Sequence, residues 1–203
     1  MKKTLTAVAL TVALALAGCS GPATPQATTG AAGGGAPAAS APAQKGDLLA
    51  TYGLTGLSGK EIVEKIDQDD TKRPLAMRAS VRYDHVIIGD GQTQTEVPIQ
   101  ADDNGFYLSI APYAAKTHEC HFHSLATCQG EMVGKPVQVK ITDSTGKVLV
   151  DEQATTYANG FVGFWLPRDI TGTVEVTVDS KTGTVPFATG PQDATCLTTL
   201  QVS

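Results

Sequence analysis

The sequence has 203 residues, four of them cysteines, and its 20 Asp and Glu outnumber its 15 Lys and Arg, which gives a formal net charge of −5. An acidic chain offers no positive surface for the phosphates of nucleic acid or anionic lipid. We therefore exclude nucleic acid as a partner and expect any membrane attachment to be through a lipid anchor only.

The first 18 residues have the pattern of a lipoprotein signal peptide. Lys2 and Lys3 precede the apolar run 6–17, and Leu-Ala-Gly stands directly before Cys19. The run is shorter than the ~20 residues of a membrane-spanning helix. Cleavage before Cys19 would leave a cysteine for two acyl chains, which suffice for stable anchoring. We expect an extracytoplasmic protein, lipid-anchored to the membrane on the cell surface or the periplasmic side.

Residues 19–44 form a tether rich in Ala, Gly and Pro. From position 20 to position 44 the chain has no charged and no large apolar side chain. Such a segment cannot bury a core, so we predict a disordered spacer. A flexible chain of this length reaches on the order of 25–30 Å.

The N-terminal lobe, residues 45–100, combines helix with strand patterns. Ser58 and Glu61 have the spacing of a capping box and predict a helix over 59–68, with a further helical turn near Leu48. Alternating apolar residues predict one strand from position 79 to 87. The turn Gly89-Asp90-Gly91 joins it to a second strand over 93–99 in a hairpin.

The remaining residues, 101–203, form a β-rich segment. Its strands are short and separated by turn residues, and they are predicted over 106–110, 136–141, 147–150, 160–166 and 173–178. The predicted fold class is α+β, mainly β: an antiparallel β-sandwich-like domain with a small helical N-terminal lobe.

Soft metal ligands are concentrated in residues 118–128, which hold two of the four cysteines and three of the four histidines. With Cys19 lipidated, Cys120, Cys128 and Cys196 remain, so at least one sulfur has no intramolecular partner. Two or three thiolates favour Cu(I), with Zn(II), Cd(II) and Hg(II) as competitors. Zinc is the weaker candidate, because seven residues separate the first two cysteines and no second paired motif exists.

Several alternatives stay open on spacing alone. Any two of the three cysteines could form a disulfide, and a bridge between two chains would make a homodimer. If the histidine-rich stretch were a strand, its ligands would point to opposite faces, so convergence requires an irregular loop. The protein could also be a disulfide-stapled structural or adhesive β-sandwich lipoprotein without metal function. Thiol catalysis lacks a hydrolase signature.

Four stretches of the sequence resemble the CueP family of exported copper-binding proteins. They are Phe106–Tyr113, Thr117–Glu131, Asn159–Phe161 with Trp165–Arg168, and Asp193–Leu200. The resemblance covers essentially all of 45–203. It implies copper resistance, or delivery to a copper-acceptor protein, in the extracytoplasmic space.

The resemblance also implies site residues. It identifies Cys120, Cys128 and Cys196 as the copper thiolates and as redox thiols that could reduce Cu(II) to Cu(I). His118, His121 and His123 match the same motif and are implied as auxiliary ligands. The lipobox and tether are a departure, since the family is better known as soluble and periplasmic.

Overall fold

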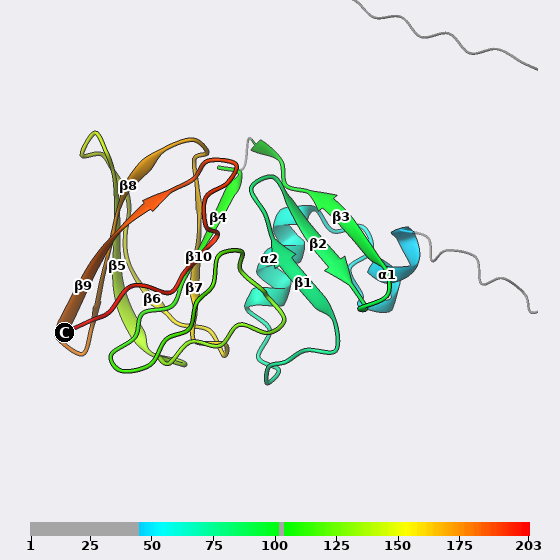
Figure 1. Cartoon of the computed structure of the whole chain (residues 1–203), viewed down its shortest axis with the longest axis horizontal. Coiled ribbons are helices and arrows are strands. Elements are labelled where there is room, and N and C mark those ends of the chain that lie inside the picture. The colour runs from blue at the N-terminus through cyan, green and yellow to red at the C-terminus, as the bar shows by residue number, and fades with distance from the viewer. Residues whose placement is uncertain (1–44, 102–103) are drawn as a thin grey trace, which may run out of the picture. The chain divides into compact units, whose positions relative to one another are not determined.

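The structure, a computed structural model, describes residues 45–101 and 104–203. The predicted signal peptide, the lipidated Cys19 and the tether 19–44 lie outside these residues. In the described ranges strands predominate and the two helices are near the N-terminal end (Figure 1). The sheets are largely antiparallel, which confirms the predicted class. No helix in these ranges is long and apolar enough to cross a membrane.

Two short helices begin the described chain, α1 (Lys45–Thr51) and α2 (Gly59–Asp67). The predicted capping box starts α2. Ser58 Oγ accepts a hydrogen bond from the Glu61 amide at 3.3 Å, and Glu61 Oε2 accepts one from the Ser58 amide at 2.8 Å. The predicted helix over 59–68 is therefore confirmed to within one residue at its end.

The helices pack on a three-stranded antiparallel sheet of β1 (Arg78–Val81), β2 (His85–Gly89) and β3 (Gln94–Pro98). The single strand predicted from 79 to 87 is wrong, because the chain reverses after β1 and forms two strands. The hairpin between β2 and β3 is confirmed. The buried stripe of α2 contacts the apolar side chains of β1 and β2, with Ile62, Val63, Ile66, Val81, Val86 and Ile88 in one cluster.

A β-sandwich-like arrangement of two sheets forms the rest of the described chain (Figure 1). In the smaller sheet β4 (Phe106–Ile110) lies between two partners, antiparallel to β7 (Val162–Leu166) and parallel to β10 (Cys196–Leu197). The larger sheet has the order β6-β5-β8-β9, with β5 (Pro136–Asp143), β6 (Val148–Thr155), β8 (Thr171–Val178) and β9 (Lys181–Ala188).

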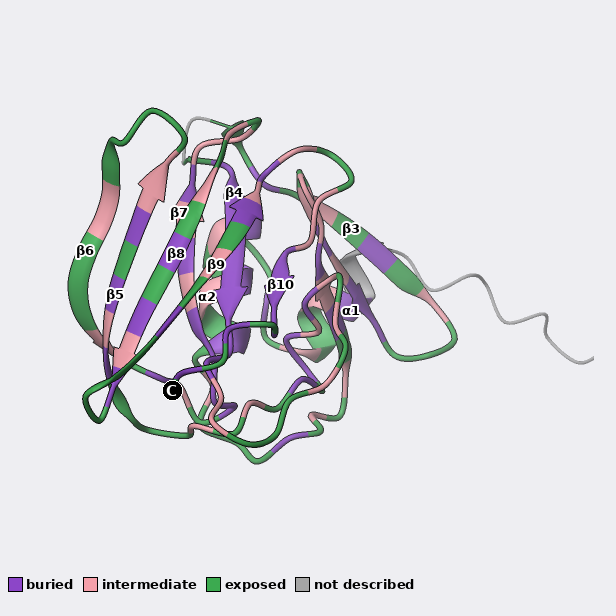
Figure 2. Ribbon diagram, turned by 60° about the vertical axis from the view of Figure 1, so that its left-hand side comes forward, coloured by how far each residue is buried: buried purple, intermediate pink, exposed green. Residues whose placement is uncertain are grey.

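Apolar side chains from both sheets share one core. Buried and exposed residues alternate along β5 and β8 (Figure 2), so that one face of the larger sheet meets β4 and β7. Strand β9 was not predicted, since Gly183 and Pro186 interrupt its pattern. Pro186 is tolerated because β9 is an edge strand with a single neighbour.

A long connection between β4 and β5 carries the histidine-rich stretch 118–128. It has no named strand and docks through its backbone on β1 and the segment before it: the Val81 amide donates to the His123 carbonyl at 3.0 Å, and the Leu75 amide donates to the Ala126 carbonyl at 2.9 Å. Leu125 is buried with the side chains of α2 and β1. The connection is therefore an irregular loop held against the N-terminal lobe. The division of the chain at residue 100 stays a prediction.

Candidate metal centre

Two sulfur atoms of this loop meet a third from near the C-terminal end of the sequence. Cys120 and Cys196 form a disulfide across 76 residues, with their Cα atoms 5.7 Å apart. Cys128 is a buried free thiol, and its Sγ lies 3.5 Å from Cys120 Sγ. Of the three pairings left open by spacing, the structure contains the one between Cys120 and Cys196.

Strand β10 brings the late cysteine to the other two. Cys196 lies beside Ser109 in the parallel pairing of β10 with β4, and the Ser109 amide donates to the Thr195 carbonyl at 3.0 Å. The Cys196 amide also donates to the His121 carbonyl at 3.1 Å. The position of this cysteine is thus fixed by backbone bonds to a buried strand on one side and to the histidine-rich loop on the other.

One of the three histidines points into the sulfur cluster. His123 Nδ1 lies 3.6 Å from Cys196 Sγ, and one ligand atom from each of His123, Cys120, Cys128 and Cys196 lies within 4.8 Å of the other three. The His123 side chain is completely buried and packs on the Phe161 ring, with 4.5 Å between ring centroids. These four side chains form what we call the Cys₃His cluster.

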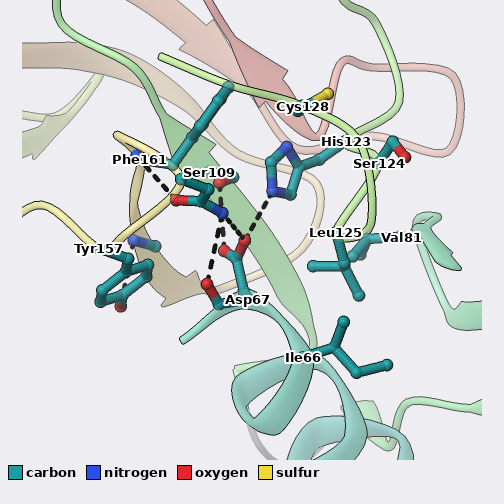
Figure 3. Close-up of polar contacts among 12 residues, drawn as sticks. Ile66, Asp67, Val81, Ser109, His123, Ser124, Leu125, Cys128, Tyr157 and Phe161 are labelled. Atoms are coloured by element: carbon teal, nitrogen blue, oxygen red, sulfur yellow. Dashed lines mark hydrogen bonds and ion pairs between the residues drawn. The ribbon is translucent and has the colours of Figure 1, made fainter. Parts of the chain in front are cut away.

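The other ring nitrogen of His123 contacts a buried carboxylate (Figure 3). His123 Nε2 lies 2.9 Å from Oδ1 of Asp67, the last residue of α2. The Asp67 carboxylate also accepts hydrogen bonds from Tyr107 Oη at 2.7 Å, Asn159 Nδ2 at 2.7 Å and Ser109 Oγ at 3.4 Å. Side chains of β4, of the segment before β7 and of the histidine-rich loop therefore all contact one carboxylate at the end of α2.

The two buried charges stabilise each other. Burial alone would raise the pKa of Asp67, but His123 and the hydrogen bonds from Tyr107 and Asn159 lower it below its ordinary value. Burial alone would lower the pKa of His123, but Asp67, with a smaller effect of Cys128, raises it to about 9. Without metal, His123 is therefore an imidazolium paired with the Asp67 carboxylate at neutral pH.

The other two histidines of the stretch lie outside the Cys₃His cluster. His121 is exposed, and its Nε2 lies 3.0 Å from the Gln192 carbonyl, to which it donates. His118 packs edge-on against Phe161, with 6.2 Å between ring centroids. Its Nε2 is buried and has no hydrogen-bond partner within the described part of the chain.

Two surface hollows adjoin the Cys₃His cluster. One, of about 460 Å³, is lined by residues that include Cys128, Gly130 and Glu131. The other, of about 370 Å³, is lined by residues that include Cys120 and Tyr113. Both also include Thr117 and His118 in their walls. His123 and Cys196 are thus buried, whereas Cys120 and Cys128 are among the residues that line solvent-accessible hollows.

The donor set fits a soft metal ion. Three thiolates and one imidazole are the ligands that Cu(I) and Zn(II) prefer, whereas Mg²⁺ and Ca²⁺ select oxygen. In the disulfide form only the Cys128 thiol and the His123 imidazole are free to bind. Reduction of the bridge releases the other two sulfurs within the same small volume, so the redox state sets the number of ligands.

Comparison with known proteins connects this geometry to a family. The family model described as periplasmic copper-binding protein CueP matches residues 61–201, which include the whole Cys₃His cluster and Asp67. The chain belongs to the CueP family. A crystal structure of S.CueP is 42% identical to it, with a TM-score of 0.76, and the match covers 79% of this chain and 98% of that one. No curated protein matches the chain.

Membership of the CueP family confirms the resemblance drawn from the cysteine motifs. The family description, periplasmic and copper-binding, agrees with the expectation of an extracytoplasmic protein. Asp67 was missed by sequence reasoning. The signal that could have found it is a charged residue four positions after Val63, on the apolar stripe of a predicted helix.

Proposed function

We propose that the protein binds copper outside the cytoplasm, as Cu(I), through Cys120, Cys128, Cys196 and His123. The observation that carries this proposal is the convergence of three sulfurs and one imidazole nitrogen within 4.8 Å of one another at a partly buried site. Thiolates select Cu(I) over harder ions. Binding requires deprotonated thiols and a free His123 Nδ1, so it releases protons and weakens as the pH falls.

The same thiols can supply electrons to Cu(II). Two Cu(II) ions each accept one electron from the thiolates of Cys120 and Cys196, which yields two Cu(I) and one disulfide. The disulfide between these residues supports this proposal, because it is the form that such a reaction would leave. In this form Cys128 and His123 remain as ligands, and a reductant must restore the dithiol before a second cycle.

His118 extends the site toward solvent. Its buried Nε2 has no partner in the described chain, and the residue lines both hollows, whose walls also include Cys128 and Cys120. We assign it to the path by which copper arrives. His121, whose Nε2 already donates to a carbonyl, can offer copper only Nδ1.

Lipid attachment at Cys19 would hold this site near a membrane, with 19–44 as the spacer. The role in the cell would then be copper resistance, or transfer to a copper-acceptor protein.

A copper titration tests the proposal. The full chain with Cys19→Ser keeps only the three thiols of the cluster, and it is reduced and titrated anaerobically with Cu(I) against a competing chelator. One Cu(I) per chain is expected. Cys128→Ser or Cys196→Ser should weaken Cu(I) binding at least about tenfold. Removing a residue that only hydrogen-bonds to a metal ligand already costs about that much, and removing the ligand itself should cost no less. His85→Ala, a partly exposed histidine in β2, is the matched control. Unchanged affinity in both serine variants would refute the proposal.

The disulfide itself favours a second candidate, a structural staple between the loop and β10. Counting free thiols in the same protein separates the two functions. A bridge that survives mild reductant and leaves one free thiol, with or without copper, supports the staple. A bridge that opens under mild reductant and reforms on addition of Cu(II) supports the copper site.

A further inference from the structure

We infer that Asp67 is a positioning residue of the copper site: its carboxylate fixes the His123 ring so that Nδ1, and not Nε2, faces the three sulfurs. This inference rests on the proposed function and extends it to a residue of the N-terminal lobe. Within the Cys₃His cluster, Asp67 contacts His123 and none of the three cysteines. It acts through the 2.9 Å contact between its Oδ1 and His123 Nε2.

The hydrogen-bond chemistry of a carboxylate decides which nitrogen faces the metal. An ionised carboxylate is only an acceptor, so Nε2 must carry a proton to bond it. When the imidazole loses a proton to bind metal, it keeps a single N–H; the contact with the carboxylate retains that proton on Nε2, so the lone pair is on Nδ1, which lies 3.6 Å from Cys196 Sγ. A carboxylate on the remote nitrogen also makes the imidazole a stronger electron-pair donor to a metal.

The carboxylate is itself held in one orientation. The Phe161 amide donates to Asn159 Oδ1 at 2.9 Å, so the amide of Asn159 is oriented with Nδ2 toward Asp67 Oδ1 at 2.7 Å. Tyr107 Oη donates to the other oxygen at 2.7 Å. With both oxygens engaged, the plane of the carboxylate cannot rotate without breaking a buried hydrogen bond, and the His123 ring keeps its orientation.

The end of α2 is also tied directly to the histidine-rich loop. Arg73 is buried; its guanidinium donates to the Ile66 carbonyl at 2.8 Å and to the Leu125 carbonyl at 3.0 Å. Leu125 is two positions after His123. The helix that carries the carboxylate and the loop that carries the imidazole are therefore joined by the same buried cation.

The charge balance argues against a purely structural role. Asp67 and His123 are fully buried, and within the described residues His123 is the single ion-pair partner of Asp67. Apolar side chains of similar size at a buried ion pair are often no less stable than the pair itself. Stability alone therefore does not explain the Asp67 carboxylate. Its effect on the orientation of His123, the histidine that faces the three cysteines, does.

Two substitutions of Asp67 distinguish its role as a hydrogen-bond acceptor from the effect of its negative charge. Asp67→Asn can keep every bond, with its amide oxygen toward His123 and Asn159 and its amide nitrogen toward the hydroxyls of Tyr107 and Ser109. Asp67→Leu has similar shape and no acceptor. We expect Cu(I) affinity to fall about 10- to 100-fold in Asp67→Leu and by less in Asp67→Asn. His85→Ala, which changes a histidine of β2 outside this hydrogen-bond network, should stay within about threefold of wild type.

A double-mutant cycle tests whether the effect passes through His123. In a His123→Ala background, Asp67→Leu should change Cu(I) affinity by less than about threefold, because no ring is left to position. Nitrogen NMR of the metal-free, reduced chain above pH 9 gives an independent readout. The His123 ring proton should be on Nε2 in wild type and should shift toward Nδ1 in Asp67→Leu.

The outcomes are distinguishable. If the wild-type chain binds no Cu(I), the proposed function fails. If it binds, but Asp67→Leu keeps wild-type affinity and an Nε2 proton, the inference is refuted while the function stands. An undiminished effect of Asp67→Leu in the His123→Ala background also refutes it. If thermal unfolding shows that Asp67→Leu does not fold, Asp67→Asn takes its place. The inference then requires that Asp67→Asn lowers Cu(I) affinity in the wild-type background and has no effect in the His123→Ala background.

Discussion

The buried pair of Asp67 and His123 predicts that the metal-free protein loses stability at alkaline pH. His123 has a pKa of about 9 when folded and an ordinary value of 6.5. Its contribution is fully present below pH 6.5 and is lost as the pH rises through 9. At about 1.4 kcal/mol per pKa unit, the free energy of unfolding should fall by roughly 3 kcal/mol across this window.

The acid side of the profile has the opposite sign. The pKa of Asp67 lies below its ordinary 3.8, so the stabilisation it provides is present above that value and is lost as the pH falls through the folded pKa. The contribution of the pair should therefore be largest between about pH 4 and pH 6.5.

Urea unfolding followed by tryptophan fluorescence measures this change. Trp165 is the single tryptophan, half-buried beside Tyr107, with its Nε1 donating to Glu64 at 2.9 Å. The protein is kept in the disulfide form with Cys19→Ser and Cys128→Ser, so that no free thiol titrates in the same range. His123→Gln serves as the control and should flatten the profile between pH 6.5 and 9. A parent protein with equal or rising stability over that window would refute the ion-pair reasoning.

Three further substitutions have defined outcomes. Gly163→Ala would place a Cβ on the Tyr107 hydroxyl, and thermal unfolding should show a loss of about 1–3 kcal/mol. Arg73→Met leaves buried carbonyls without their donor and should cost about 3 kcal/mol, measured by urea unfolding. His118→Ala should slow the transfer of Cu(I) from a chelator to the protein in stopped-flow measurements. It should leave the equilibrium affinity within about threefold, because His118 lies outside the Cys₃His cluster.

Each of these expectations can fail clearly. Wild-type stability in Gly163→Ala would mean that Tyr107 moves without cost. A neutral Arg73→Met would show that water replaces the guanidinium. An affinity loss in His118→Ala as large as that of a cysteine variant would place His118 among the ligands.

Local patterns predicted those parts of the fold that depend on neighbouring residues. The capping box of Ser58 and Glu61 set the start of α2, and the turn after Gly89 joined two strands as expected. The reversal between β1 and β2 was missed because Arg82-Tyr83-Asp84 contains no glycine or proline and continues the alternation of the strands. That turn is imposed by pairing with β2, which is a tertiary effect.

The candidate site divides in the same way. Residue chemistry and the family resemblance pointed to the three cysteines and to histidines near them, but not to which histidine faces the sulfurs. The parallel pairing of β10 with β4 and the docking of the loop on β1 select His123, and both depend on contacts far apart in sequence. The place of Asp67 on the apolar stripe of α2 marks it as unusual, but its partners lie 40 to 92 residues away, so the local sequence does not show what it contacts.

The position of Cys196 in β10 has a consequence for biogenesis. Its sulfur is the last of the three to be synthesised, and the pairing of β10 with β4 places it beside Cys120. A nascent chain halted before residue 196 presents two of the three thiols and cannot complete the site. Under the proposed function, all three sulfurs are available to copper only in a chain whose β10 is paired with β4, so the folded protein is the form that captures the ion.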